Sequence, residues 1–405
     1  MSMRKTIFTP PKRGIWMKFL HTSDLHIGIK LSGYSLDEDI RHILAGILEC
    51  AKREGCTAVV IAGDIYDRSN PTPSANVIFD EFVTSCVCEG IAVIAISGNH
   101  DSPERVAYMS SLLLKNGVHF SPVFDGEVRF VDLSDEFGAV RFYMLPFIRP
   151  INVKEACADF DGKTYSDAVA HVTGKIISDD DAPKRSVMVT HQFVTSGEAS
   201  ADGESDAEVG GIGNVSASAF DGFSYTALGH IHRAYNVGLE SVRYCGSPLK
   251  LSFSEVTDEK TVTVVEIDGE GNVNTKAVAI TPLCDMREIR GSYEYVTSRE
   301  ARESGAVNDY LRIVLTDDEM IEDVSAKLRC IYPNLMRIAY DNNRTREIRD
   351  VTEAAEREFD AVSPIEVFAE LFELQNNTSP DEEILKIAED LFADCAEDFR
   401  GGERV

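Results

Sequence analysis

The chain has 405 residues, of which 43% are hydrophobic, and it carries a formal net charge of −28. This size and apolar content are those of a globular protein large enough for two domains, which excludes a chain that is disordered as a whole. The negative charge excludes a protein that attracts nucleic acid through its overall field, so any such contact must be local or depend on cations or a partner. No apolar run approaches the roughly 18 to 20 residues of a membrane span, and the N-terminus lacks a signal-peptide core. We expect a cytoplasmic protein without membrane contact.

The first sixteen residues are basic, contain proline and show no periodicity, so we expect 1–16 to be an N-terminal extension outside the fold. A strand-like run begins at Met17. Further on, apolar runs predict strands at 57–62, 91–97, 139–145, 186–190 and 225–228, and helical patterns occur at 36–54, 74–88, 104–115 and 163–178. Short buried strands separated by helices indicate an α/β fold built as a layered sheet or sandwich. A hairpin turning at 269–272 closes this first domain, 17–281.

A smaller α/β unit is expected at 282–350. Its predicted strands lie at 285–290, 310–315 and 334–340, with helical segments near 293–304 and 319–331. Outside the basic residues 1–16 it has the smallest net negative charge, −3 (11 minus 14), and its basic residues include Arg287, Arg290, Arg312, Lys327, Arg329, Arg337, Arg344, Arg346 and Arg349. This unit is therefore the part best suited to meet phosphates, although exposed arginines are often only solvated.

The last segment, 351–405, is strongly acidic, with sixteen acidic residues against four basic ones and a net charge of −12 (4 minus 16). Ser-Pro pairs at 363–364 and 379–380 are helix-start signals, and they predict two amphipathic helices within 363–398. Their apolar side chains are enough for a contact in a partner's groove, or for packing on the second domain. The charge would repel DNA and suits a basic protein partner; the alternative is a solvated helix face.

Polar side chains able to bind metal ions follow five of the predicted strands, at the point where each strand ends. The clusters are Asp24 with His26, Asp64, Asn99 with His100 and Asp101, His191, and His230 with His232. Open α/β sheets build their sites at the carboxyl ends of strands, and residues two apart on an extended segment point to the same side. Gly63, Gly98 and Gly229 allow tight turns directly before three of the clusters. One such histidine is usually structural, but five clusters together predict a metal centre.

Seven candidate ligands are too many for one ion and enough for two. Two metal ions about 3.5 to 4 Å apart stabilise both the attacking and the leaving oxygen in the hydrolysis of phosphate esters. The pattern therefore predicts a two-metal phosphoesterase.

This ordered set resembles the motifs of the calcineurin-like metallophosphoesterases over most of residues 17–235. The resemblance implies a first metal held by Asp24, His26, Asp64 and His232, and a second held by Asp64, Asn99, His191 and His230. It also implies that His100 binds no metal and acts as an acid on the leaving oxygen, for which an imidazole is suited. Asp67 matches the acid that orients this histidine in related phosphatases, with Asp101 as the competing candidate. Oxygen and nitrogen ligands fit Mn²⁺, with Fe, Zn or Mg as alternatives.

Three further segments resemble the bacterial SbcD nucleases, which are counterparts of the Mre-type DNA repair nucleases. They are LPFIRP at 145–150, YCGSPLKLSFSE at 244–255 and SPIEVFAELFELQNN at 363–377. The resemblance covers about 17–390 and implies a β-sandwich nuclease domain flanked by helices, a DNA-facing capping domain at 282–350, and C-terminal helices in 351–405. These helices would bind an SbcC-type coiled-coil ATPase.

The same resemblance implies a Mn²⁺-dependent nuclease with double-strand 3′-5′ exonuclease and single-strand endonuclease activity. Such an enzyme processes DNA ends and hairpins in repair, replication and recombination, as a homodimer within a heterotetramer. The helices at 74–88 and 104–115 are the candidates for the dimer contact. Archaeal and eukaryotic relatives usually have a histidine, which contacts substrate phosphate, where Asp67 stands, so that contact must come from elsewhere here or be absent.

The main alternative is a small-molecule or cyclic nucleotide phosphodiesterase of the same fold. Such an enzyme would not need residues 282–400. A protein phosphatase is disfavoured, because the chain reads GDIYDRSN and GNHD where those enzymes read GDxxDRG and GNHE. A non-catalytic scaffold is disfavoured because no ligand of the pattern is missing.

Overall fold

The structure is a computed structural model that describes residues 16–178, 183–196, 213–342, 380 and 384–385. The helices expected within 363–398 lie outside the described residues except for Pro380, Ile384 and Leu385, and the expected extension 1–16 does so except for Trp16. The chain divides into two compact units. The first runs to Glu288 and includes Arg302–Arg312 and Arg329–Arg337; the second comprises Ile289–Ala301, Ile313–Leu328 and the chain from Ile338.

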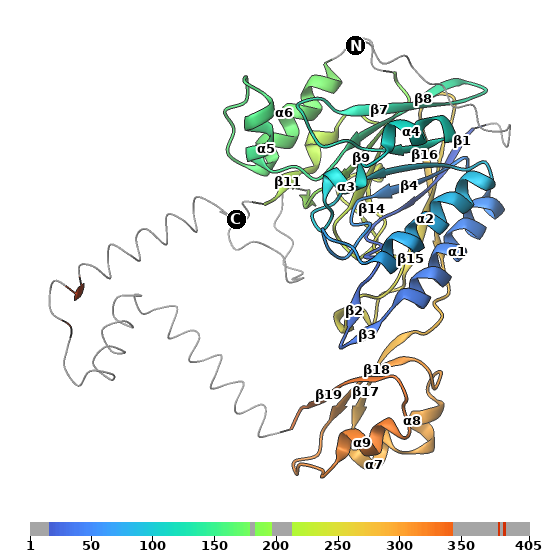
Figure 1. The fold of residues 1–405 in the computed structure, drawn as a ribbon, viewed down its shortest axis with the longest axis vertical. Helices are drawn as coiled ribbons and strands as arrows, with labels where there is room; N and C mark the ends of the chain where they lie inside the picture. The colour runs from blue at the N-terminus through green and yellow to red at the C-terminus, as the bar shows by residue number, and fades with distance from the viewer. Residues whose placement is uncertain (1–15, 179–182, 197–212, 343–379, 381–383, 386–405) are drawn as a thin grey trace. The chain divides into compact units, whose positions relative to one another are not determined.

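Two six-stranded sheets form the centre of the first unit (Figure 1). The first sheet has the order β16 (Val273–Ala279), β15 (Thr261–Ile267), β1 (Met17–Thr22), β4 (Ala58–Ala62), β5 (Ala92–Ile96), β6 (Val118–Phe120). The second has the order β13 (Tyr235–Asn236), β14 (Val242–Tyr244), β12 (Tyr225–Gly229), β9 (Ser186–His191), β8 (Gly138–Leu145), β7 (Arg129–Asp135). The central strands of both sheets are parallel to their neighbours, whereas β15, β16, β7 and β13 pair antiparallel at the edges.

The sheets pack face to face through a shared apolar core. Phe19 of β1 meets Phe142 of β8 edge to face, with 5.0 Å between the ring centroids, and both side chains are fully buried. Burying such a ring contributes about 1.5 to 3 kcal/mol relative to leaving it in water. β4 (AVVIA) and β5 (AVIAI) have every residue buried, as expected of parallel strands covered on both faces.

Helices cover the outer face of each sheet. The helices α1 (Asp37–Glu54) and α2 (Pro73–Cys88) lie side by side on the first sheet, and α5 (Pro150–Ala156) and α6 (Tyr165–Ile177) pack on the second (Figure 1). The side chain of Thr72 caps α2 by accepting from the amide of Ala75, and Pro73 occupies its first turn, where a missing N–H costs nothing. The first unit is therefore a four-layered α/β sandwich, as predicted.

The expected helix at 104–115 is broken. It consists of α3 (Pro103–Val106), α4 (Ser110–Leu113) and a 3₁₀ turn at Leu114–Asn116, and Met109 between α3 and α4 has a positive φ of 60°. β7 was not predicted, because an edge strand alternates polar and apolar residues and has no continuous apolar run. The predicted helices at 36–54, 74–88 and 163–178 correspond to α1, α2 and α6.

A three-stranded sheet follows in the order β17 (Met286–Gly291), β18 (Tyr310–Leu315), β19 (Leu335–Tyr340). Short helices accompany it, α7 (Tyr293–Val296), α8 (Arg299–Glu303) and α9 (Val324–Arg329), so the helical segments expected at 293–304 and 319–331 are shorter than predicted. Two-residue strands complete the described elements: β2 (Lys30–Leu31), β3 (Tyr34–Ser35), β10 (Val194–Thr195) and β11 (Val215–Ser216), with 3₁₀ turns at Ala217–Phe220 and Phe253–Glu255. No helix in the described part of the chain is long and apolar enough to cross a membrane.

Candidate metal centre

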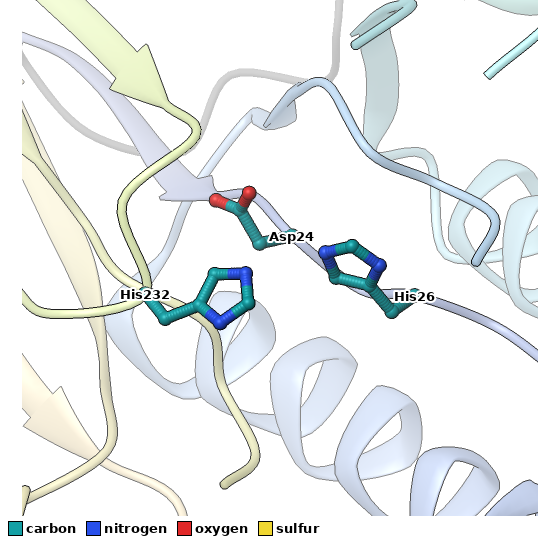
Figure 2. Close-up of side chains that lie close together, drawn as sticks. All are labelled: Asp24, His26 and His232. Atoms are coloured by element: carbon teal, nitrogen blue, oxygen red, sulfur yellow. The ribbon is translucent and has the colours of Figure 1, made fainter. Parts of the chain in front are cut away.

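The carboxyl ends of β1, β4, β5, β9 and β12 meet at one place, across both sheets. The loops after β1 and β4 are joined by main-chain hydrogen bonds from Asp24 N to Gly63 O (3.0 Å) and from His26 N to Asp64 O (3.1 Å). From the second sheet, the amide of His230 donates to both carboxylate oxygens of Asp24 (3.1 and 3.2 Å). Residues far apart in the sequence therefore form a single site, and Figure 2 shows His26 and His232 gathered around Asp24.

The backbone is strained where these side chains begin. Asp24, His26, Asp64 and His230 have positive φ angles of 52°, 42°, 49° and 102°, and they are four of the seven described non-glycine residues in that region. Each such conformation costs on the order of 1 to 3 kcal/mol and persists only where surrounding contacts enforce it. The concentration of this strain at one point marks a functional site.

The three glycines predicted for tight turns are needed mainly because the chains approach closely. A Cβ atom on Gly98 would lie 2.1 Å from Asp64 Oδ1, and one on Gly229 would lie 2.0 Å from the carbonyl oxygen of Ala62. Gly63 combines a φ of +90° with a Cβ position 2.4 Å from His191 Nδ1. Only Gly63 of the three has the positive φ that favours glycine, whereas the other two make room for the ligands.

One set of ligand atoms comes from Asp24, His26 and His232, whose donor atoms lie within 4.8 Å of one another. The side chain of His26 is 4% exposed, and its buried Nε2 has no hydrogen-bond partner among the described residues. A buried, unpaired imidazole nitrogen beside carboxylates is suited to a cation, so this set fits a divalent metal.

A second set comes from Asp24, Asp64 and His191, again with donor atoms within 4.8 Å. His191 donates from Nδ1 to the carbonyl oxygen of Ala62 (2.8 Å), which leaves Nε2 directed at the site. This Nε2 lies 3.0 Å from Asn99 Oδ1 and 3.3 Å from Asp64 Oδ2. A fixed tautomer of this kind is what a metal-binding histidine requires.

His230 and Asn99 complete the second set on its outer side. His230 Nδ1 lies 3.1 Å from Asn99 Oδ1, and the ring of His230 stands 5.2 Å from that of His191. Asp64 lies between the two sets, because its Oδ2 is also 3.6 Å from His26 Nε2. All seven predicted ligands are thus brought together, while the metal that each one holds stays a prediction.

Burial and neighbouring charges oppose each other at this centre. Burial disfavours the charged form of Asp64, but the charge and hydrogen bond of His191 hold the pKa of that carboxyl below its usual value. Burial likewise disfavours the charged form of His191, yet the charge of Asp64 raises its pKa to about 9. Burial prevails at His26 and lowers its pKa. The Asp64 carboxylate and the His191 imidazole therefore favour each other's charged form, and a divalent cation held here would take over the favourable charge that the imidazole supplies to Asp64.

His100 stands at the exposed rim of the site, with its ring centroid 4.8 Å from that of His26. The sequence predicted that a carboxylate, of Asp67 or Asp101, orients this ring. In the structure His100 Nδ1 instead donates to the main-chain carbonyl of Asp67 (3.0 Å), while the Asp67 carboxylate lies 3.8 Å from His26 Nδ1. The reason is the turn after β4, which directs the Asp67 carbonyl to His100 and its side chain to His26.

Asp101 contacts main-chain donors on both sides of the site, while its predicted role in orienting His100 stays a prediction. Its buried carboxylate accepts three main-chain N–H groups, from Ile65 (3.1 Å), Tyr66 (2.9 Å) and Gly98 (2.9 Å). Burial and the charge of Asp64 raise its pKa to about 6. These bonds hold the loop after β4 against the loop after β5, so Asp101 stabilises the frame of the site.

Glu255 is part of the site and was not predicted from the sequence. It is 2% exposed, and its Oε1 lies 3.1 Å from His232 Nδ1. Burial favours the neutral form of His232, but this hydrogen bond raises the pKa of the imidazole. Glu255 is the last residue of the segment at 244–255 that carries the family resemblance, and nothing in the spacing relates it to a histidine 23 positions earlier.

Comparisons with known proteins agree with this geometry. The profile of the calcineurin-like phosphoesterase family matches residues 17–234, more than half of the chain. The profile of the type 5 capsule protein repressor C-terminal domain matches residues 282–376. A relative from Staphylococcus epidermidis, the SbcD subunit of the nuclease SbcCD, is 31% identical over 324 residues, which cover 80% of this chain and 85% of that protein. The chain therefore belongs to the calcineurin-like phosphoesterases, as a member of the SbcD nuclease family and a hydrolase of phosphodiester bonds.

Proposed function

We propose that the chain is the nuclease subunit of an SbcC-SbcD-type complex and hydrolyses DNA phosphodiester bonds with two divalent metal ions. The main support for two ions is the position of the Asp64 carboxylate between the two sets of candidate ligands. Its Oδ2 lies 3.3 Å from His191 Nε2 and 3.6 Å from His26 Nε2. One oxygen facing two histidines from two ligand sets is the arrangement that a bridged pair of ions needs. The similarity to a nuclease subunit over 80% of the chain supports DNA as the substrate.

The first ion would be held by Asp24, His26, Asp64 and His232, and the second by Asp64, Asn99, His191 and His230. Two such ions, when bound, would supply Lewis-acid polarisation of the phosphate and lower the pKa of a bound water molecule. The mixture of carboxylate, amide and imidazole ligands suits Mn²⁺, with Fe, Zn or Mg as alternatives. The buried Nε2 of His26, which has no hydrogen-bond partner among the described residues, supports this assignment.

His100 is proposed as the general acid. Its Nδ1 donates to the carbonyl of Asp67, which fixes the ring and leaves Nε2 pointing away from that contact. As the water oxygen bonds to phosphorus it would release a proton to the solvent, the bond from phosphorus to the leaving oxygen would break, and the Nε2 proton of the His100 imidazolium would pass to that leaving oxygen. The imidazole that remains keeps its Nδ1 proton and its bond to Asp67.

The capping unit at 282–350 is proposed to face DNA. Several of its arginines are already paired with carboxylates: Arg287 with Asp309, Arg290 with Asp341 and Arg312 with Glu288. Phosphate contacts in the described part of this unit would therefore fall to the exposed Lys327, Arg329 and Arg337. Residues 17–281 would form the nuclease domain.

Two protein contacts complete the proposal. The acidic segment 351–405 would bind the SbcC-type ATPase, an assignment that rests on its sequence because it lies almost wholly outside the described residues. The homodimer of the heterotetramer would form through α2 and the α3–α4 segment. Exposed apolar side chains on that segment support the assignment, since Tyr108 is 68%, Met109 52% and Leu112 70% exposed.

The test is cleavage of end-labelled linear duplex and hairpin DNA with Mn²⁺, with and without the ATPase partner, next to a small chromogenic phosphodiester. We expect the wild type to cut both substrates and His100→Ala to lose roughly 10² to 10⁴ in rate. Hydrolysis of the small ester without any DNA cleavage would instead support a small-molecule phosphodiesterase. Equal DNA cleavage by both variants would point to a contaminating nuclease.

The partner contact is tested with a chain that ends before residue 363. It should fail to bind the ATPase and still hydrolyse the small ester. Loss of both properties would mean that the C-terminal segment belongs to the folded core.

A further inference from the structure

A buried ion pair between Glu255 and Lys260 contacts the imidazole ring of His232. The carboxylate of Glu255 is 3% exposed and the ammonium of Lys260 8% exposed, with 2.6 Å between Glu255 Oε2 and Lys260 Nζ. The same Oε2 accepts the amide of Leu251 (3.2 Å), while Oε1 lies 3.1 Å from His232 Nδ1. Two of these contacts are with donors, and the third is with a ring nitrogen whose role depends on the tautomer.

We propose that Glu255 is a positioning residue that selects the tautomer of His232 in which Nδ1 carries the proton and Nε2 is free to bind the first metal. An ionised carboxylate can only accept, so the imidazole must donate from Nδ1. A histidine has only one proton in its neutral form, and its other nitrogen then has a lone pair directed into the site. This inference rests on the two-metal centre proposed above.

Lys260 holds the main chain of the same ligand. Its Nζ donates to the carbonyl oxygen of His232 (2.8 Å), and the amide of Ser247 donates to that oxygen as well (3.1 Å). One buried pair thus fixes both the ring and the backbone of His232. His191 obtains the same tautomer from the carbonyl of Ala62, so the two ligand sets use different devices for one purpose.

The contacts make Glu255→Gln an informative variant. Two donors, Leu251 N and Lys260 Nζ, point at Oε2, and they would draw the single amide oxygen of glutamine to their side. The amide NH₂ would then face His232 Nδ1. Because that nitrogen would have to accept, the ring would carry its proton on Nε2, where it blocks a metal ion. An isosteric change thus reverses the tautomer.

The first readout needs no metal and no substrate. Nitrogen-15 spectra of histidine-labelled, metal-free protein, recorded at alkaline pH where the ring is neutral, report the tautomer, and a His232→Gln difference spectrum assigns the signal. We expect His232 to be protonated on Nδ1 in the wild type and on Nε2 in Glu255→Gln. A wild-type His232 protonated on Nε2 would overturn the proposal, even if no Glu255 variant folds.

The second readout is metal binding, measured by titration with Mn²⁺ alone and by electron paramagnetic resonance. The wild type should bind two ions that give a spin-coupled spectrum. Glu255→Gln should bind one of them on the order of 10- to 100-fold more weakly and give the six-line spectrum of an isolated Mn²⁺. Its hydrolysis of a small phosphodiester should recover at high Mn²⁺, whereas that of His100→Ala should not. Unchanged affinity for both ions in Glu255→Gln would refute the idea.

Asp135→Asn is the matched control. Asp135 pairs with Arg185 in an equally buried site, with side chains 7% and 6% exposed, in contact with no predicted ligand. It should lose stability but keep both metal ions and the wild-type His232 tautomer. If the wild type binds two ions but does not cut DNA, the proposed nuclease function is wrong, and the role of Glu255 is unaffected. If the wild type cuts DNA and Glu255→Gln binds metal normally, the role of Glu255 is wrong, and the nuclease function is unaffected.

Discussion

His191 and Ala62 join the two sheets at the metal centre. The imidazole at the end of β9 donates from Nδ1 to the carbonyl at the end of β4, with 2.8 Å between the two atoms. The same contact sets His191 Nε2 at 3.3 Å from Asp64 Oδ2. The centre therefore forms only when the two sheets pack together. Binding of metal ions should for this reason be coupled to folding.

This coupling predicts that metal stabilises the fold. Each ion that binds only the folded state adds about 2.7 kcal/mol to the free energy of unfolding when its concentration is 100 times its Kd. Addition of Mn²⁺ to the chelator-treated wild type should therefore raise Tm, and the rise should be smaller in His191→Gln, which loses one ligand and the link to Ala62. Differential scanning fluorimetry over a Mn²⁺ series measures this. An equal rise in both proteins would remove His191 from the ligand set.

Asp67 and Asp101 should respond differently to the loss of charge. Because the carbonyl of Asp67 orients His100, Asp67→Asn should lower kcat far less than the roughly 10² to 10⁴ expected for loss of the general acid itself. Asp101→Asn leaves at least one of three buried N–H donors without an acceptor, which should cost about 1 to 3 kcal/mol.

Urea unfolding and kcat on a small phosphodiester separate these two effects. A large loss of kcat in Asp67→Asn with unchanged stability would restore the Asp67 carboxylate as the orienting group. A stable Asp101→Asn would mean that its three hydrogen bonds are dispensable.

Gly98 and Gly174 form a matched pair for substitution by alanine. A Cβ at Gly98 meets Asp64 Oδ1 at 2.1 Å, so Gly98→Ala should displace that carboxylate and reduce activity by at least about 100-fold. Gly174, in helix α6, has no atom within 4 Å of its Cβ position, and Gly174→Ala should stabilise the protein by about 0.5 to 1 kcal/mol without changing activity. Kinetics with thermal unfolding test both, and an active Gly98→Ala would show that the loop after β5 can yield.

His119 predicts a pH dependence of stability outside the metal centre. It lies in β6, 2% exposed, its Nε2 has no partner among the described residues, and burial lowers its pKa to about 4 from 6.5. As pH falls below about 6.5, His119 binds a proton in the unfolded chain but stays neutral in the folded chain. The free energy of unfolding therefore decreases until pH approaches 4. Each pKa unit is worth about 1.4 kcal/mol.

Between pH 7.5 and 5.5 the free energy of unfolding from urea titrations should therefore fall by about 1 kcal/mol more in the wild type than in His119→Leu, whose side chain cannot titrate. The variant also serves as its own control for other groups, since these titrate in both proteins. Parallel pH profiles would mean that His119 gains a proton in the folded state.

Much of the fold was predictable because it is written in local patterns. The strands β4 and β5 are continuous apolar runs. Helix α2 begins at a Thr-Pro pair, which is a local signal for a helix start. The broken helix at 104–115 was not predictable, because Met109 adopts its positive φ without any glycine to announce it. The spacing of apolar residues does not reveal such a turn.

For the site, the sequence by itself determined the candidate ligands and their order along the chain, each after a strand. Within each sheet that order brings the candidates together, because the carboxyl ends of neighbouring parallel strands lie at one edge: β1, β4 and β5 in the first sheet, β9 and β12 in the second. The order does not show that these two edges meet. Only the tertiary structure decided which group contacts the Nδ1 atom of each of three histidines. These groups are the carbonyl of Ala62 at His191, the carboxylate of Glu255 at His232, and the carbonyl of Asp67 at His100. These contacts join separate segments over distances of a few ångströms, and a main-chain carbonyl has no residue type, so no spacing along the chain can reveal them.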